Sequence, residues 1–357
     1  MALTGAMSAG ISGLKAHMEA LNVVGNNVAN VNTYGYKAGR VTFRESIYST
    51  QSAGSAGTDT VGGTNPRQTG YGTSVGTIDL DMTSQSLEST GMPLDCAIQG
   101  DGFFLVGPKN LDFTTQDDFK SLYLSRVGDF RFDADGYLVD GGGNVVYGFL
   151  TTSNTQGAAG TTAGTTSTVL VPIRLPLAAV ADNNLGAEVG ATVYPGMGDP
   201  GDNANVAPDA DDVGDPINYT SLQIDENGRI TCVNDDTKDP VVVGYIAIGK
   251  VENPNGLTHT QECYYTAGDA AGDISVSAPN SAVTGNLNNQ TDDDAPEGTR
   301  LLGGSQTSIM TGFLEQSGTD LATEFANMIV YQRGYQANTR IITVTDSMLE
   351  ELVNIKR

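Results

Sequence analysis

The sequence predicts an α+β protein in which a long helix at each end of the chain flanks a mainly β middle. Three observations lead to this expectation. Apolar residues near both ends recur in alternating steps of three and four, which is the repeat of one helical face. All 13 prolines lie between Pro66 and Pro296, so no proline interrupts a helix at either end. Between these limits Gly, Thr, Asn and Asp separate short apolar runs, as in proteins built of short strands and turns.

The first helix is expected from about Thr4 to about Asn30, where several asparagines lower the helix propensity and Gly35 closes the segment. One apolar row runs along this helix, and Gly25 fills the gap in its repeat. A helix with such a row must bury it against another helix, so we predict that the row is an assembly interface. Its members are Met7, Ile11, Leu14, Met18, Leu21 and Val28.

The last helix is expected to begin near Ser317, because Ser317 and Asp320 have the spacing of a capping box. Gly334 is its one weak interior point. Three polar residues stand in its apolar row and would favour one packing register: Gln332, Thr339 and Asp346. The apolar members are Leu321, Phe325, Met328, Tyr335, Ile342, Leu349 and Val353. Rows at opposite termini predict that the ends pair, either as a helical hairpin within one chain or between copies.

Composition divides the rest of the chain. A stretch rich in Ser, Gly and Thr follows the first helix and has too few apolar residues for a core of its own. Farther on, no Lys or Arg lies between Arg174 and Arg229, which indicates an inserted β segment with acidic loops. The expected parts are terminal helices at 1–35 and 306–357, an extended linker at 36–75, an inner β domain at 76–149 and 217–305, and an inserted outer β domain at 150–216.

Two turn signals, Asp135-Gly136 and Asn227-Gly228, stand between apolar runs and predict β-hairpins. The first also invites comparison with a calcium-binding loop. An EF-hand loop needs an acidic first ligand and a glutamate at its twelfth position, where this chain has Arg131 and Gly142. The second fails in the same way, so both segments are interpreted as turns.

The formal net charge is −24, with a pI near 4.1, which argues against binding to nucleic acid or to an anionic membrane surface. No apolar run approaches the roughly 18 residues needed to span a bilayer. The first residues lack a basic segment followed by a long apolar block, so we expect no cleaved secretory signal. The three cysteines fit neither a disulfide framework nor a zinc site, and Cys96 is expected in the core.

Candidate catalytic residues are few. His17 and His259 lie far apart in the sequence, and neither has the local partners of a catalytic triad. Gly141-Gly142-Gly143 is not followed by the Lys-Ser/Thr pair of a phosphate-binding loop. We therefore expect no catalytic, cofactor-binding or metal-binding residues. The alternative class is an acidic binding module or a carbohydrate-acting enzyme that uses carboxylates such as Asp133 or Asp225.

Several motifs resemble those of the bacterial flagellar axial proteins, which include rod, hook and hook–filament junction proteins. The run Gly25–Lys37, with sequence GNNVANVNTYGYK, resembles their N-terminal signature. Ala97–Phe104 and Arg126–Val139 resemble the β motifs of rod and hook proteins. Four segments resemble the C-terminal helix of the family: Gly312–Ser317, Leu321–Ile329, Gln332–Asn338 and Met348–Arg357. The motif residues are Asn26, Asn27, Asn30, Thr33, Gly35, Tyr36, Lys37, Gln332, Arg333, Gln336 and Asn338.

The resemblance implies a structural subunit of the flagellar hook, the flexible joint that transmits torque from the basal body to the filament. A distal-rod protein is the alternative. On assembly the terminal helices would form an inner coiled-coil tube, so the chain would be a homopolymer. The implied partners are the rod, hook–filament junction and hook cap proteins and the type III export apparatus. Cys232 or Cys263 could take part in a covalent cross-link, a possibility that the sequence leaves open.

Overall fold

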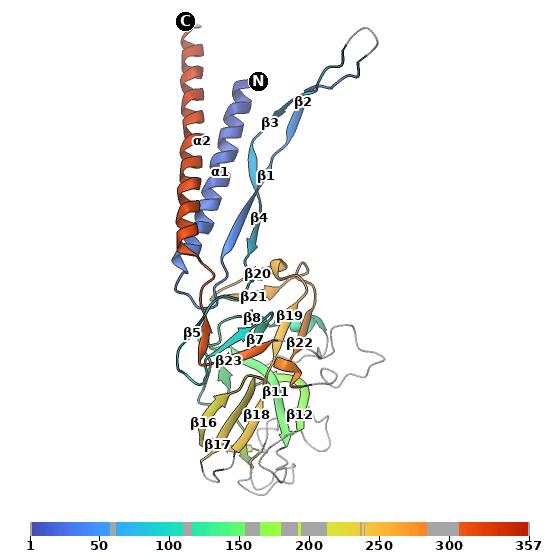
Figure 1. The fold of residues 1–357 in the computed structure, drawn as a ribbon, viewed down its shortest axis with the longest axis vertical. Coiled ribbons are helices and arrows are strands. Elements are labelled where there is room, and N and C mark those ends of the chain that lie inside the picture. Colours follow the sequence, from blue (N-terminus) through green and yellow to red (C-terminus); the bar gives the residue numbers. More distant parts are fainter. Residues whose placement is uncertain are drawn as a thin grey trace. The chain divides into compact units, whose positions relative to one another are not determined.

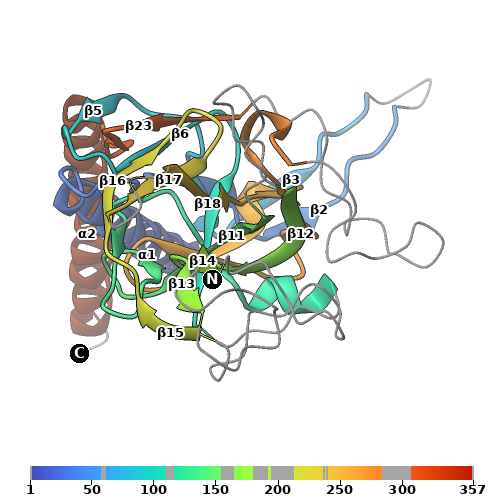
Figure 2. The same ribbon diagram turned by 90° about the horizontal axis from the view of Figure 1, so that it is seen from below.

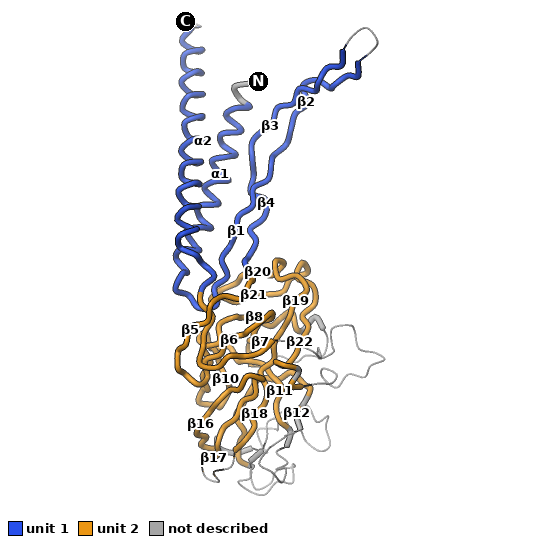
Figure 3. The backbone as a smooth tube through the Cα atoms, viewed as in Figure 1, with its two compact units in different colours: residues 1–81, 317–357 blue, residues 82–316 orange. Residues whose placement is uncertain are grey.

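The computed structural model describes residues 2–57, 62–109, 116–153, 165–179, 192–193, 213–235, 238, 240–283 and 307–355. The chain forms two compact units (Figure 3). The terminal unit consists of Met1–Asp81 and Ser317–Arg357, and the middle unit of Met82–Gln316. The two ends of the sequence therefore fold together, as the apolar rows predicted.

The terminal unit holds the two helices, α1 (Ala2–Ala29) and α2 (Leu321–Ile355), which lie side by side with both chain ends at the same end of the pair (Figure 1). The expected start of α2 near Ser317 is wrong. Asp320 is the cap instead, because its carboxylate accepts hydrogen bonds from Ala322 N at 3.0 Å and Thr323 Oγ1 at 2.6 Å. The Ser317 hydroxyl accepts from Thr319 N, within the turn before the helix.

A long β arm completes the terminal unit. Strand β1 (Gly39–Glu45) pairs antiparallel with β4 (Thr73–Leu80), and β2 (Tyr48–Ser52) pairs with β3 (Arg67–Gly70). The segment expected as an extended linker thus forms two paired ribbons within its described residues. The arm also touches α1, since the Ser12 hydroxyl donates to Tyr71 O at 3.2 Å. Pairing with another strand and with the helix gives this segment the support that its own side chains lack.

The middle unit is built on a large antiparallel sheet (Figure 1 and Figure 2). Its main path in the described residues runs β16-β17-β18-β11-β7-β8-β21-β20. These strands are β16 (Tyr219–Ile224), β17 (Arg229–Asn234), β18 (Pro240–Ile246), β11 (Val145–Ser153), β7 (Phe103–Gly107), β8 (Tyr123–Ser125), β21 (Tyr264–Ala267) and β20 (Leu257–His259). Joined to this path are β9 (Arg131–Phe132), β10 (Leu138–Val139), β12 (Thr165–Pro172), β19 (Ile248–Val251) and β22 (Ile274–Ser277).

Two further strand pairs lie near the two ends of the middle unit's sequence. Strand β5 (Leu87–Ser89) pairs with β24 (Phe313–Glu315), and β6 (Cys96–Gln99) pairs with β23 (Ser308–Thr311). The first part of the unit is thereby joined to its last part. Three short 3₁₀ helices complete the described elements: η1 (Gln116–Ser121), η2 (Pro254–Gly256) and η3 (Pro279–Ser281).

Both predicted hairpins are confirmed. Strands β9 and β10 pair across the Asp133–Gly136 turn, and β16 pairs with β17 across Asp225–Gly228. The turn glycines adopt positive φ angles of 80° at Gly136 and 69° at Gly228. A side chain at either position would be strained, which is why the Asp-Gly and Asn-Gly signals were informative.

The inserted segment 150–216 is described only in part, and its assignment as a separate outer domain stays a prediction. Its strand β12 joins the main sheet by pairing with β11. The short strands β13 (Leu177–Ala179), β14 (Thr192–Val193) and β15 (Val213–Pro216) form a small sheet of their own. The rest of the segment lies outside the described residues.

The hydrophobic core of the middle unit lies between the strands of the main sheet and those of the β6–β23 pair. Phe104 packs edge-on against Phe130, with ring centroids 4.9 Å apart. Cys96 lies in this core with no exposed surface, as expected, and Cys232 joins it. Other members are Ile98, Val106, Leu138, Val146, Leu150, Ile173, Ile230, Val243, Ile246, Ile248 and Ile309.

Candidate assembly interface

The N-terminal asparagine motif closes α1 and turns the chain into the β arm. Asn27 is buried, and its side-chain amide donates to Gly39 O at 2.8 Å and to Glu324 Oε1 at 3.1 Å. Its carbonyl oxygen accepts from Gly39 N and from the Tyr36 hydroxyl. One side chain thus joins the end of α1, the start of β1 and the first turn of α2. Burial raises the pKa of Glu324, and the Asn27 amide opposes that rise.

The neighbouring motif residues complete this turn. Asn26 donates to the Tyr36 hydroxyl at 3.0 Å, and Asn30 accepts from the Thr33 hydroxyl at 3.1 Å. Gly35 has a φ of 67°, which only glycine adopts readily, and Lys37 is fully buried. Tyr36 O in turn accepts from Gly318 N, just before α2. The motif therefore sets the path of the chain just after α1 and just before α2.

Small residues form the face of α1 that meets α2, and sequence reasoning missed them. Among the described residues of α1, six positions are buried, and four of the six are glycine or alanine. Five of them fall one residue before a position of the predicted row, and Ala16 falls two residues before Met18. The six positions are Gly10, Gly13, Ala16, Ala20, Val24 and Asn27. A row of glycine and alanine at the helical repeat, next to a row of larger apolar residues, was the available signal. Such residues let two helices approach closely.

Contacts between the helices follow an antiparallel order. Asn27 of α1 meets Glu324 of α2, and toward the chain ends Gly13 meets Asn338. A Cβ at Gly13 would lie 2.7 Å from the Asn338 amide nitrogen, so a larger residue there would force the Asn338 side chain to move. The less exposed positions of α2 are Glu324, Asn327, Met328, Tyr331, Gly334, Tyr335, Asn338, Thr339, Ile342 and Thr345. Four of them, Met328, Tyr335, Thr339 and Ile342, belong to the predicted row, and each of the others lies one residue before a position of that row.

Most of the predicted apolar rows are consequently left partly open. On α1, Ile11 and Met18 are exposed, whereas Met7, Leu14, Leu21 and Val28 are half-buried. On α2, Leu321, Phe325, Leu349 and Val353 are all exposed. The helix pair within one chain buries the small-residue row and leaves an exposed apolar surface that lies mainly on α2, with Ile11 and Met18 exposed on α1. The role of the predicted rows in assembly stays a prediction.

An aromatic cluster joins the two helices and the arm. The ring of His17 on α1 lies 5.5 Å from Phe43 on β1 and 6.2 Å from Tyr331 on α2, and Phe43 lies 5.8 Å from Tyr331. Gly334 makes room for it, since a Cβ there would lie 2.6 Å from His17 Nε2. His17 therefore packs between three elements, and Gly334 is required by this packing rather than being a flaw in α2.

The C-terminal motif divides between the two sides of α2. Asn338 faces α1, as described above. Gln332, Arg333 and Gln336 are exposed, and Arg333 Nη1 donates to Gln336 Oε1 at 3.4 Å. These three polar side chains separate an apolar group near the start of α2 from a second one nearer its end. Among the exposed members of these groups are Phe325, Ile329, Ile341, Val344, Met348 and Leu352.

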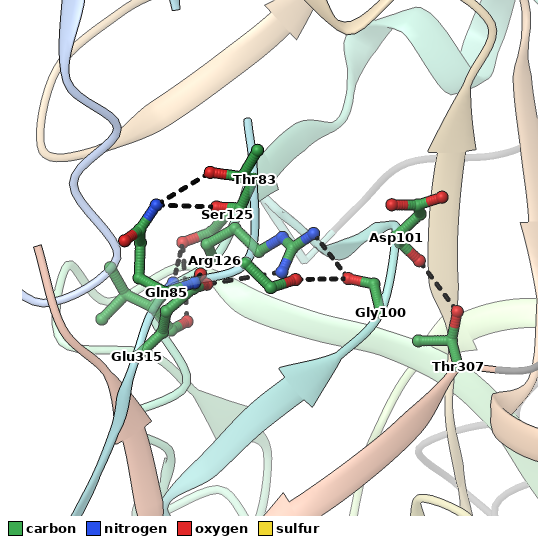
Figure 4. A network of polar contacts seen from close by, with 10 residues as sticks. Thr83, Gln85, Gly100, Asp101, Ser125, Arg126, Thr307 and Glu315 are labelled. Carbon is green, nitrogen blue, oxygen red and sulfur yellow. Dashed lines mark hydrogen bonds and ion pairs between the residues drawn. The ribbon is translucent and has the colours of Figure 1, made fainter. Parts of the chain in front are cut away.

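A buried ion pair joins Arg126, the residue after β8, to Glu315 at the end of the last strand of the middle unit, β24 (Figure 4). Arg126 Nη1 lies 3.4 Å from Glu315 Oε2, and the two side chains are 3% and 0% exposed. Arg126 Nη2 also donates to Gly100 O at 2.9 Å, and Glu315 Oε1 accepts from Gln85 N at 2.8 Å. Burial lowers the pKa of Arg126, and the Glu315 carboxylate opposes that shift. The pair thus anchors the chain where it enters and leaves this unit.

The carboxylates considered for an enzyme or binding role serve the hairpin turns. Asp133 accepts from Asp135 N and Tyr137 N, and it forms an ion pair with Lys109 at 3.0 Å. Asp225 accepts from Asn227 N and pairs with Arg229 at 3.1 Å. Among the described residues, no three His, Cys, Asp or Glu side chains gather as a ligand set for a metal ion.

The three thiols are buried, which bears on the possible cross-link. Burial raises the pKa of Cys232 to about 12 and also raises the pKa of Cys96 and of Cys263. A thiol needs its thiolate form to react, so these side chains are poorly placed for covalent chemistry in the folded chain. No helix in the described part of the chain combines the length and hydropathy of a membrane span.

Comparison with known proteins adds the family. A model described as "Flagella basal body rod protein" matches residues 7–37, and one described as "Flagellar basal body rod FlgEFG protein C-terminal" matches residues 310–355. These ranges hold α1 with its asparagine motif, and α2 with the strands before it.

Full-length relatives agree. The flagellar basal-body rod protein FlgG of Bacillus subtilis is 32% identical over 98% of this chain and 97% of its own length. The flagellar hook protein FlgE of Borreliella burgdorferi is 26% identical over 97% and 98%, and that of Escherichia coli is 27% identical over 98% and 100%. The chain therefore belongs to the flagellar rod and hook protein family.

Proposed function

We propose that this chain is a structural, non-enzymatic subunit of the bacterial flagellar hook that polymerises with its own copies through the terminal unit. One observation carries the proposal. Among the described residues, the large apolar side chains that are exposed lie almost entirely in the terminal unit, and Met92 is the exception. The large apolar side chains of the middle unit are otherwise covered, whereas the terminal unit presents an exposed apolar surface of the kind that marks a protein interface.

The arrangement of the helices supports burial between copies. Each helix packs one face against the other, and within the described residues no further element of the terminal unit covers the outer face of α2, whose apolar side chains stay exposed. An amphipathic face of this size gains free energy only when another apolar surface covers it. Copies of the same chain supply that surface, with their own open helix faces, and a tube of such helices would be the inner wall of the polymer.

A distal-rod protein is the second candidate, and a specific observation favours it. The rod relative from Bacillus subtilis aligns over 348 residues, whereas the hook relatives align over 428 and 472. This chain has 357 residues and is therefore nearer the rod relative in length. The resemblance of the C-terminal motif and the inserted segment favour the hook. Polymer shape separates the two, because a hook subunit is expected to give curved, flexible polymers and a rod subunit straight, rigid ones.

The family also suggests where the chain acts and with what. We expect the protein in the hook or basal body, between the rod and the hook–filament junction proteins, with a hook cap protein during growth. Export would use the flagellar type III apparatus. The turn-forming roles of Asp133 and Asp225 support a structural rather than a catalytic function.

The proposal is tested by altering the outer face of α2. The triple variant Ile329→Gln/Val344→Gln/Met348→Gln changes residues that are 58%, 53% and 49% exposed, so the single chain should keep its fold. We expect it to form no polymer under conditions in which the unaltered chain does. The matched control is Met92→Gln, an equally exposed apolar residue of the middle unit at 60%, which should polymerise normally. Polymers of the triple variant, seen by electron microscopy at the control's protein concentration, would contradict the proposal.

A further inference from the structure

Nearly all of the net charge of this chain lies in one of its two units. The terminal unit contains 9 Lys and Arg against 10 Asp and Glu, a net charge of −1. The middle unit contains 9 Lys and Arg against 32 Asp and Glu, a net charge of −23. The unit with the open apolar surface is therefore almost neutral, and the unit with the closed core is strongly anionic.

The basic residues of the middle unit are mostly occupied within that unit. Six of its nine Lys and Arg residues form ion pairs with carboxylates of the same unit: Lys109, Lys120, Arg126, Arg229, Lys238 and Lys250. A seventh, Arg174, lies over the Tyr137 ring at 4.9 Å, and Arg300 lies outside the described residues. Among the described residues, Arg131 is left as the one basic side chain with neither kind of partner.

Carboxylates, by contrast, are left over. Glu226, Glu252, Glu262 and Asp269 are exposed, and within the described residues none of them has a basic side chain within ion-pair distance. Two middle units brought side by side would therefore set carboxylates against carboxylates. Neither unit has enough free basic side chains to pair with the carboxylates of the other.

We propose that mobile inorganic cations accumulate between neighbouring middle units when this chain polymerises. The critical concentration for polymerisation therefore depends on ionic strength. This inference rests on the proposed polymerisation through the terminal unit. The neutral helices attract through apolar contacts, which salt changes little, while the anionic units repel at a range set by the Debye length. That length falls from about 30 Å at 0.01 M salt to about 3 Å at 1 M. Screening cations thus decide whether the apolar contacts can form.

The test is the critical concentration for polymerisation of the full chain, measured by sedimentation across NaCl concentrations from about 10 mM to about 1 M. We expect the critical concentration to fall by about tenfold or more over this range, because added salt screens the repulsion between the anionic middle units. The variant Glu226→Gln/Glu252→Gln/Glu262→Gln/Asp269→Asn removes four negative charges and changes the net charge of the middle unit from −23 to −19. It should reach the same critical concentration at lower salt.

A matched control exchanges neutral side chains on the same unit. The variant Asn255→Gln/Thr258→Ser/Gln261→Asn alters exposed positions without changing charge and should follow the salt curve of the unaltered chain. A critical concentration that does not respond to NaCl would overturn the inference. So would a salt response that the charge-reduced variant shares unchanged, because salt would then act on the apolar contacts. A chain that never polymerises at any salt concentration would instead contradict the proposed function.

Discussion

Replacing Glu315 by leucine should strongly destabilise the middle unit, because it leaves the Arg126 guanidinium buried without a counter-charge. The two charged groups lie 3.4 Å apart. At this distance their attraction is about 5 kcal/mol with an effective dielectric constant of about 20. Loss of one partner from a buried ion pair generally costs about 3–5 kcal/mol. We therefore expect Glu315→Leu to lower the free energy of unfolding by an amount in that range.

The double variant Arg126→Met/Glu315→Leu should recover most of that loss. It removes both charges, and well-packed apolar replacements of a buried pair are often neutral or stabilising. The pair is also imperfect, since Arg126 Nε is buried with no hydrogen-bond partner among the described residues. Urea unfolding of the unpolymerised chain, followed by circular dichroism, measures all three proteins. The reasoning is refuted if Glu315→Leu costs less than about 1 kcal/mol, or if the double variant is as unstable as the single one.

Three further predictions follow from the packing and the titratable groups. Gly334→Ala should destabilise the helix pair despite the higher helix propensity of alanine, because the new Cβ would meet His17. In the control Gly25→Ala the new Cβ meets nothing within 4 Å, so this variant should stabilise α1 by about 0.5–1 kcal/mol. Thermal unfolding of the monomer compares the two variants, and equal effects would contradict the packing of His17 against Gly334. The three buried thiols should react with a thiol reagent only after unfolding, so rapid labelling of the native chain would oppose their assignment to the interior. Hydrogen bonds from Thr323 and Ala322 lower the pKa of Asp320. The stabilisation of the first turn of α2 by this carboxylate is therefore present above the unfolded pKa of about 3.9 and is lost as the pH falls through the lower folded pKa. Hydrogen exchange of the first-turn amides should show this loss of protection, and Asp320→Asn should remove its pH dependence.

Periodicity located the two long helices but not the face on which they meet. The repeat of large apolar residues correctly predicted α1 and α2 within a few residues of their ends. The contact face lies one residue away on α1, where Gly10 and Gly13 allow the backbones to approach. A search for large apolar side chains passes over a glycine and alanine row, because such a row contributes little transfer free energy and acts through close packing.

Local chemistry explains which parts of the middle unit were predictable. The turns at Gly136 and Gly228 were visible because they depend on residues adjacent in sequence. The Arg126–Glu315 pair joins residues 189 positions apart, and nothing near either residue in the sequence indicates the other. The start of α2 was misplaced because Ser317 and Asp320 are both good caps, and only the hydrogen bonds to Asp320 distinguish them.

The central claim is that the open faces of the terminal helices hold the polymer together, and electron cryo-microscopy of polymers grown from the full chain tests it most directly. The account predicts an inner tube formed by α1 and α2 of neighbouring copies, with Ile329, Val344 and Met348 buried between subunits. A polymer joined only through the middle units, with these three side chains still facing solvent, would contradict it.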